Sequence, residues 1–554
     1  MRKPFKYIKR FTMLNTIYEQ YSKISPVVYG PEFAEKYGTL SLDVTNSMKL
    51  ANGPLLFHIY VDVSGSMSDV LDDGRTKMQL LRHTLCNILH YFADKCSNIY
   101  VQVKGFDDSI HDYIQPIEVN KSNVQELIAK VESIRPMNST NIGLALFELN
   151  KDIESEHQNI PVPLKNRIAI MLTDGEPTTG IENKTELVNI IKHNCPHHFI
   201  ALGNEHNGKL MYELGHKSLH TSNWFINDLE HTANVYGEIL FNETHRIFYE
   251  NKITVSGGKI YDYNTGEFVN ELEIGTLYDE TNKNYHLMIE DDERFTVIIS
   301  GKNECDSNPY CIMAGKKIYN MDTNSTIQEN ELKVQITKQY LRLCVQKLMF
   351  ELRKQSDNEN ENEHKYKFPR RLYHARQVDK PSNEFNDKVT IMYNFLVTYM
   401  RENNLQEDEF ILELLKDVNV MKNCYNKEEL FKIVSAREDS QGQQTAFNTS
   451  SQYDENLRDI LPPKLARAPS SAYCTPGRTN LIREISDNTN ISLIPPDDIM
   501  DESQNVFGFG FQRPSLLRSP VSAYNSPGRN LVVNAISSEN DQEEEDDLPD
   551  VSIN

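Results

Sequence analysis

The sequence predicts an α/β domain with a doubly wound, mostly parallel sheet, followed by a β-rich unit, a small helical domain and a disordered acidic tail. Three observations predict this order. Short apolar runs alternate with helical segments between residues 50 and 248, which is typical of βα units around a parallel sheet. Short strands separated by turn residues follow up to residue 320, and helical periodicity and then polar sequence occupy the rest.

The predicted α/β domain, residues 50–248, contains five strand candidates. Each is a short run rich in apolar residues, as a strand buried on both faces requires: residues 55–61, 99–106, 167–173, 198–202 and 221–226. A helix is expected after the first strand, because apolar residues recur there at intervals of three and four: Met78, Leu81, Leu85, Ile88, Leu89 and Phe92. This stripe faces the sheet.

The other regions are assigned from turn residues and composition. Residues 1–49 are interpreted as an N-terminal extension, and 249–320 as a sandwich-like β-rich domain in which GG, NTG and DDE turns separate the strands. Residues 328–448 form a helical domain with a polar insertion near 355–385, where the run SDNENENEHK interrupts the pattern. The remaining residues, 449–554, are rich in Ser, Pro, Asn and Asp, which predicts a disordered tail.

The predicted tail contains one repeat. SAYCTPGR at 471–478 returns as SAYNSPGR at 522–529, an offset of 51 residues. Two copies are too few for a solenoid, which needs at least three stacked units. We interpret them as two linear motifs that bind a second partner, with duplication without function as the alternative. Thr475 and Ser526 each precede proline, which suggests regulated phosphorylation.

Charge and hydropathy restrict the function and the location. The chain has 554 residues with 58 Lys and Arg against 80 Asp and Glu, a net charge of −22, which opposes nonspecific attraction to nucleic acid. No stretch reaches the 18 apolar residues of a membrane span, and because no continuous apolar segment follows the basic residues at the amino end, we expect no secretory signal there. Eight cysteines without a CxxC pair argue against a disulfide framework. We therefore predict an intracellular, cytoplasmic protein that binds no nucleic acid.

Oxygen-bearing side chains follow two strands and precede one helix in the α/β domain. Asp62, Ser64 and Ser66 come after the first strand, Thr140 precedes a helix, and Asp174 follows the strand at 167–173. Loops at the carboxyl ends of parallel strands meet at one edge of the sheet. Hydroxyl and carboxylate oxygens are the ligands that hard divalent cations select. Helix capping is the alternative role for each residue taken singly.

The segments DVSGS, STNIGLAL and LTDG, in this order, resemble the metal-ion-dependent adhesion site of von Willebrand factor A domains. The resemblance covers about 200 of the 554 residues and implies a Rossmann-like fold with a complete site at Asp62, Ser64, Ser66, Thr140 and Asp174. It also implies that the three hydroxyl residues bind the cation directly in the ligand-bound state. The two aspartates would then reach the cation through water.

The cation expected at such a site is Mg²⁺, with Mn²⁺ or Ca²⁺ as alternatives. Three neutral hydroxyls compensate the charge of Mg²⁺ poorly, so an open coordination position attracts an outside Asp or Glu. We predict a non-catalytic protein-protein interaction module that binds a carboxylate-bearing partner. The alternative is a non-catalytic adaptor or subunit of a ubiquitin-linked or ATPase complex, in which the domain docks substrates. No phosphate-binding loop or GxSxG nucleophile motif is present, and we expect no enzymatic activity.

Overall fold

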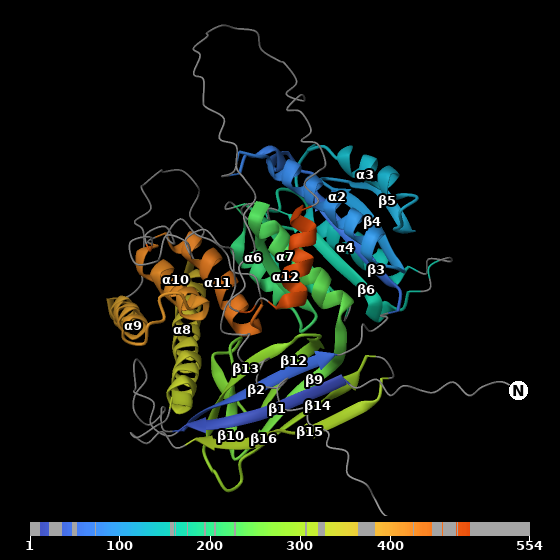
Figure 1. Cartoon of the computed structure of the whole chain (residues 1–554). Coiled ribbons are helices and arrows are strands. Elements are labelled where there is room, and N and C mark those ends of the chain that lie inside the picture. Colours follow the sequence, from blue (N-terminus) through green and yellow to red (C-terminus); the bar gives the residue numbers. More distant parts are fainter. Residues whose placement is uncertain are drawn as a thin grey trace, which may run out of the picture. The chain divides into compact units, whose positions relative to one another are not determined.

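The computed structural model (Figure 1) describes much of the chain up to residue 487. The described residues are 12–21, 36–46, 53–71, 74–155, 160, 162–173, 176–192, 195–203, 206–226, 229–304, 307–319, 327–363, 383–424, 426–445, 457, 473 and 475–487. Among them, no helix combines the length and apolarity needed to cross a membrane.

The α/β domain is built on a six-stranded sheet in the order β5-β4-β3-β6-β7-β8. Its strands are β3 (Leu55–Asp62), β4 (Ile99–Phe106), β5 (Ile110–Glu118), β6 (Arg167–Thr173), β7 (His197–Leu202) and β8 (Thr221–Ile226). All neighbours pair in parallel except β4 and β5, which are antiparallel. The predicted, mostly parallel sheet is thereby confirmed. Strand β5 was not predicted; it contains Pro116, which is tolerated at the edge of a sheet.

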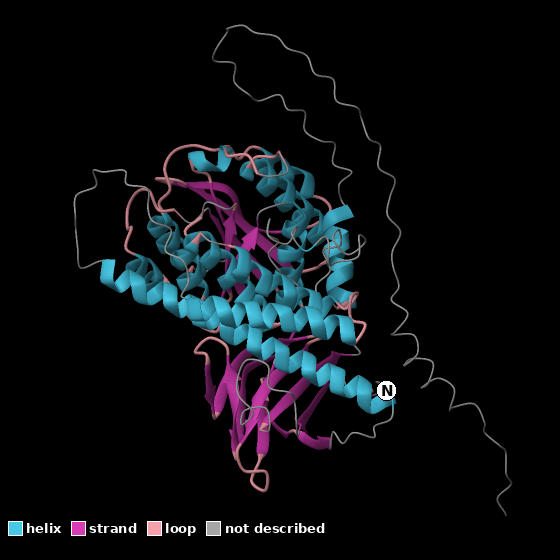
Figure 2. Ribbon diagram, turned by 90° about the vertical axis from the view of Figure 1, so that its left-hand side faces the viewer, coloured by secondary structure: helices cyan, strands magenta, loops and turns pink. Residues whose placement is uncertain are grey.

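Helices cover the strands of this sheet (Figure 2). They are α2 (Lys77–Lys95), α3 (Val124–Glu132), α4 (Ile142–Glu154), α5 (Lys184–Ile190), α6 (Gly208–Gly215) and α7 (Leu229–Thr244), with short 3₁₀ turns η1 (Gly65–Ser68) and η2 (Leu164–Asn166). Their apolar residues share one core with the strands, which includes the predicted stripe of α2. Burial of β3, β4 and β6 along nearly their whole lengths explains why most of their residues are apolar.

The β-rich unit consists of two sheets. One has the order β11-β10-β13-β2-β1-β16 and the other β12-β9-β14-β15. The strands are β1 (Thr12–Tyr21), β2 (Tyr37–Asn46), β9 (Arg246–Ser256), β10 (Gly258–Asp262), β11 (Glu267–Val269), β12 (Glu271–Tyr278), β13 (Asn282–Ile289), β14 (Thr296–Asn303), β15 (Pro309–Met313) and β16 (Gly315–Tyr319). Residues from both sheets form a common apolar core, as a sandwich-like unit requires.

The prediction of a separate N-terminal extension at 1–49 is wrong, because β1 and β2 belong to this unit. Strand β2 pairs with β13, and β1 pairs with β16. Leu40, Leu42 and Val44 alternate along β2 and enter the common core. Their partners lie more than 200 residues later, so no local pattern reveals the pairing.

The helical unit contains α8 (Ile327–Glu363), α9 (Asn383–Glu402), α10 (Glu409–Asn423) and α11 (Lys427–Gln443). Their apolar faces share a second core, to which Tyr37 and Tyr261 of the β-rich unit contribute. The polar insertion was predicted from residue 355, but the structure continues α8 to Glu363. Residues 364–382 lie outside the described part.

The prediction of disorder after residue 449 is also wrong for one segment. Helix α12 (Pro476–Asp487) packs against α7 and α2 of the α/β domain. It begins within the first copy of the repeat. The second copy, residues 522–529, lies outside the described residues.

Candidate functional site

Asp62, the last residue of β3, is fully buried at the carboxyl edge of the sheet. Its Oδ1 accepts a hydrogen bond of 2.8 Å from the backbone N–H of Ser64. Its Oδ2 accepts one of 2.7 Å from the hydroxyl of Thr173, the last residue of the adjacent strand β6. These two bonds fix the orientation of the carboxylate at the end of the strand.

The hydroxyls of Ser64 and Ser66 face each other across the turn after β3. The turn is closed by hydrogen bonds from Met67 N to Ser64 O, 3.1 Å, and from Asp69 N to Ser66 O, 3.0 Å. The two Oγ atoms lie 3.0 Å apart. Adjacent ligands of an octahedral Mg²⁺, each about 2.1 Å from the metal, are separated by about 3 Å. The pair therefore has the spacing of two neighbouring corners of an octahedron.

Thr140 is buried in the loop before α4. Asn141 caps that helix, its Oδ1 accepting from Leu144 N at 3.0 Å. The backbone of Thr140 is fixed by Thr178, whose N–H donates to Thr140 O at 3.0 Å and whose hydroxyl accepts from Thr140 N at 2.8 Å. Gly65 N donates to Asn138 O at 2.8 Å. The loop of Thr140 and the turn of the two serines are thus joined through their backbones.

Four of the five predicted site residues are described, and they lie at one edge of the sheet. Asp62, Ser64 and Ser66 are linked by direct hydrogen bonds, and Thr140 is in the adjoining loop. Asp174, the fifth, lies outside the described residues. Hydroxyl and carboxylate oxygens suit a hard cation, and the serine spacing fits Mg²⁺. No group of three or more His, Cys, Asp or Glu placed to hold a metal occurs in the described part of the chain.

Asp107 supports the same edge and was not predicted. Its Oδ1 accepts hydrogen bonds from Ser109 N at 2.8 Å and from Ser109 Oγ and His111 Nε2 at 2.9 Å. Its Oδ2 accepts from Asn138 Nδ2 at 3.1 Å, which connects it to the loop of Thr140. In the sequence, an aspartate after a strand is equally typical of a turn, so no local signal distinguishes this supporting role from an ordinary turn residue.

We expect Asp107→Asn to change the acid stability of the chain. Burial opposes ionisation of Asp107, but the hydrogen bonds from His111 and Ser109 outweigh it and lower the pKa from 3.8 to about 2. A lowered pKa stabilises the fold above pH 4, and this stabilisation is lost as the pH falls towards 2. The variant should therefore lose about 2 kcal/mol relative to wild type at pH 6 and much less at pH 2.5. Urea unfolding at the two pH values measures this; an equal loss at both would contradict it.

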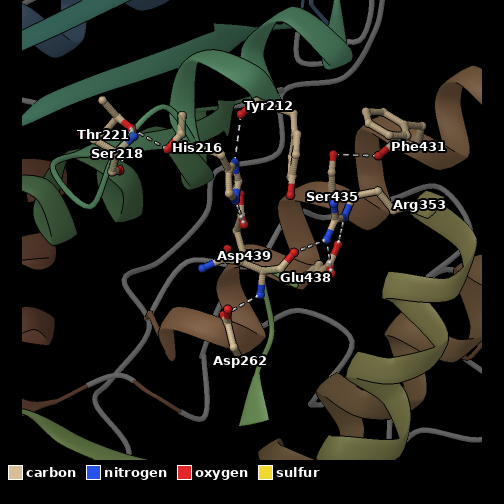
Figure 3. Close-up of polar contacts among 12 residues, drawn as sticks. Tyr212, His216, Ser218, Thr221, Asp262, Arg353, Phe431, Ser435, Glu438 and Asp439 are labelled. Atoms are coloured by element: carbon tan, nitrogen blue, oxygen red, sulfur yellow. Dashed lines mark hydrogen bonds and ion pairs between the residues drawn. The ribbon is translucent and has the colours of Figure 1, made fainter. Parts of the chain in front are cut away.

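A second polar cluster joins α6 to the helical unit (Figure 3). His216 Nε2 lies 2.8 Å from Asp439 Oδ1, and His216 Nδ1 lies 2.9 Å from the carbonyl oxygen of Tyr212. Burial alone would lower the pKa of His216, but Asp439 and the Tyr212 carbonyl raise it. Two acceptors favour a doubly protonated ring, so His216 and Asp439 form a buried ion pair.

Arg353 of α8 makes the second ion pair of this cluster, with Glu438 of α11. The two hydrogen bonds, Nε to Oε2 and Nη2 to Oε1, measure 2.8 and 3.2 Å. The guanidinium also lies over the ring of Tyr212 of α6, 4.9 Å from its centroid. The cluster therefore connects three helices of two units.

Residues 58–237 match the model of the von Willebrand factor type A domain family. A comparison with curated protein sequences gives no match. Among solved structures, the von Willebrand factor type A protein from Catenulispora acidiphila has 12% identity and a TM-score of 0.46, covering 78% of this chain and 98% of its own. The ArnB paralog VWA2 from Sulfolobus acidocaldarius has 13% identity and a TM-score of 0.42, with the same coverages.

Proposed function

Because residues 58–237 form a von Willebrand factor type A domain, we propose that this chain is a protein-interaction module that binds a carboxylate-bearing partner through a divalent cation. Ser64, Ser66 and Thr140 would hold the cation, which we infer to be Mg²⁺. Asp62 and Asp174 would support it through water. When bound, the cation supplies an open coordination position for an Asp or Glu of the partner.

The observation that carries the proposal is the pair of serine hydroxyls 3.0 Å apart, in front of a buried carboxylate. The hydroxyls are neutral, so they leave most of the charge of a divalent cation for an additional ligand. Asp62 is held by Ser64 N and Thr173 Oγ1, which keeps its negative charge behind the hydroxyls. This arrangement favours a cation that attracts an external carboxylate.

In this proposal the chain is non-catalytic and acts inside the cell, in the cytoplasm. Its described site residues supply hydroxyl oxygens and one buried carboxylate, which hold and orient a ligand. A role as adaptor in a larger enzyme complex would use the same site, with the carboxylate supplied by the substrate that it docks.

Selection of peptides from a displayed random library, on the full chain in Mg²⁺, tests the proposal. We expect the enriched peptides to contain Asp or Glu and to dissociate on addition of a chelator. They should not bind Ser64→Ala, but they should bind Ser68→Ala. Ser68 is an exposed serine of the same turn and provides a matched control. Enrichment of peptides without an acidic residue, or binding that survives chelation, would contradict the proposal.

A further inference from the structure

A buried ion pair attaches α12 to the α/β domain. Arg478, in the first turn of α12, lies 2.9 Å from Glu238 of α7, measured from Nε to Oε2; the side chains are 7% and 3% exposed. Arg478 Nη2 donates to Asn242 Oδ1 at 2.8 Å, and the guanidinium lies 4.6 Å from the ring centroid of Phe241. A buried arginine is costly unless it is paired, so this surface of α7 is complementary to an arginine.

The residues just before Arg478 also make specific contacts. Gly477 N donates to Glu280 Oε2 at 2.8 Å, and a Cβ at Gly477 would lie 2.7 Å from Phe241 Cε2. No larger residue fits there without displacing the ring. Thr475 Oγ1 accepts from Arg478 Nη1 at 3.2 Å, and the Tyr473 hydroxyl donates to Gln441 Oε1 at 2.8 Å.

Aliphatic residues complete the contact. Leu481 and Ile485 are buried in the core of the α/β domain, and Ile482 packs against that core. Ile482 lies so close to Gly237 of α7 that a side chain at Gly237 would collide with it. Asn87 Nδ2 of α2 donates to the carbonyl of Ile485 at 3.0 Å.

The second copy of the repeat carries the same contact residues. The counterparts, 51 positions later, are Tyr524, Ser526, Pro527, Gly528, Arg529, Val532, Val533 and Ile536. They keep the tyrosine, hydroxyl, glycine, arginine and aliphatic types. Among the described positions that differ in type, Asn480 and Arg483 are exposed in α12 and Thr479 is half-buried; Leu531, Asn534 and Asn530 replace them. The shared residues therefore include Gly477, Arg478 and the aliphatic residues that contact α7, α2 and the core of the α/β domain, and Tyr473, which contacts Gln441 of α11.

We propose that this surface is a recognition site for the sequence Tyr-x-(Thr/Ser)-Pro-Gly-Arg followed by aliphatic residues, and that residues 522–537 are a second ligand that competes with α12. The chain that separates the copies is long enough. Residues 488–521 can extend to at most about 120 Å, whereas α12 itself is about 18 Å long. Since one surface serves two copies, one copy is always free to bind the same surface on another molecule of this chain. This inference does not depend on the cation site.

Fluorescence anisotropy with two labelled synthetic peptides, residues 471–488 and 520–539, tests the proposal. The receptor is the full chain with Arg478→Ala and Arg529→Ala, which weakens both internal ligands. We expect the two peptides to bind with Kd values within about tenfold of each other. An Arg529→Ala version of the second peptide should bind at least about tenfold more weakly. A further Glu238→Gln change in the receptor should weaken both peptides, whereas Glu213→Gln, at an exposed position of α6, should weaken neither.

Hydrogen exchange of the full chain provides a second readout that uses no peptide. In Arg478→Ala, the amides of residues 527–538 should gain protection as the second copy occupies the surface. They should lose it again in Arg478→Ala with Arg529→Ala, while the strands of the α/β domain stay protected and report that the domain is folded. Binding of the first peptide alone, binding of neither peptide, or unchanged exchange at 527–538 would each overturn the proposal.

Discussion

Replacing Arg353 with methionine is expected to lower the free energy of unfolding by about 3 to 5 kcal/mol, the usual cost of removing one partner of a buried ion pair. Methionine retains much of the side-chain volume but leaves the Glu438 carboxylate without its guanidinium partner. Glu438 is almost fully buried, and the guanidinium of Arg353 donates both hydrogen bonds of the ion pair to its carboxylate. The variant also loses the contact with the ring of Tyr212 in α6.

The size of this loss should depend on pH. Burial raises the pKa of Glu438 from 4.5 to about 7, against the opposing effect of Arg353. A raised carboxyl pKa means that the folded state holds its proton more tightly than the unfolded state, so stability falls as the pH rises towards and through 7. Without Arg353 the pKa rises further, and the loss should be greater at pH 8 than at pH 5.

Chemical denaturation at both pH values measures this effect. Far-UV circular dichroism follows the helices, and the fluorescence of Trp224, the single tryptophan of the chain, follows the α/β domain. The matched control is the double variant Arg353→Met with Glu438→Leu, which removes both charges and should recover most of the stability. A loss below about 1 kcal/mol in the single variant at pH 8 would contradict a structural role for the pair.

Replacing Asp62 with asparagine is expected to weaken Mg²⁺ binding by about 10- to 100-fold, the usual effect of changing a residue that supports metal ligands from behind. Asparagine is nearly isosteric but neutral, and one of its two acceptor oxygens becomes an amide nitrogen. The amide oxygen can still accept from Ser64 N, and the amide nitrogen can donate to the hydroxyl of Thr173, so the variant removes the charge of residue 62 and retains its position.

The matched control for this variant is Thr173→Val, which removes one bond to Asp62 but keeps its charge. It should weaken binding less than Asp62→Asn. Calorimetric titration of Mg²⁺ into each variant gives the two affinities, and equal affinities in wild type and Asp62→Asn would contradict the supporting role.

The strands of the α/β domain that are buried on both faces could be predicted from the sequence. For β3, β4 and β6, burial favours a run of mostly apolar residues, which is a local signal. Strand β5, at the sheet edge, has only one buried residue, Ile114, among exposed and half-buried positions, and its sequence could equally be a loop. Strand β1 could not be assigned to the β-rich unit, because its pairing with β16 joins residues about 300 positions apart.

Helix α12 could not be predicted from its own sequence, for a different reason. Its composition is that of a polar tail, and its stability comes from contacts with Glu238, Asn242 and the core of the α/β domain. These partners precede it by more than 200 residues. The repeat in the sequence indicated a ligand, but the surface that receives it is visible only in three dimensions.

More of the candidate site than of the surrounding units could be predicted from the sequence. Asp62, Ser64 and Ser66 lie within five consecutive residues, so the single turn after β3 places all three side chains. The connection of Thr140 to this motif depends on backbone hydrogen bonds between two loops, such as that from Gly65 to Asn138. Asp107 was missed because its partners His111 and Asn138 are brought together only by the fold.

Calorimetric titration of Mg²⁺ and Mn²⁺ into the full chain and into Ser64→Ala tests most directly whether hydroxyl oxygens at this edge bind a cation. Wild type and the Ser68→Ala control should each bind one ion with the same heat, and Ser64→Ala should give no heat of binding while its circular dichroism stays that of wild type. An unchanged heat of binding in Ser64→Ala would show that the cation is held elsewhere and would contradict the account.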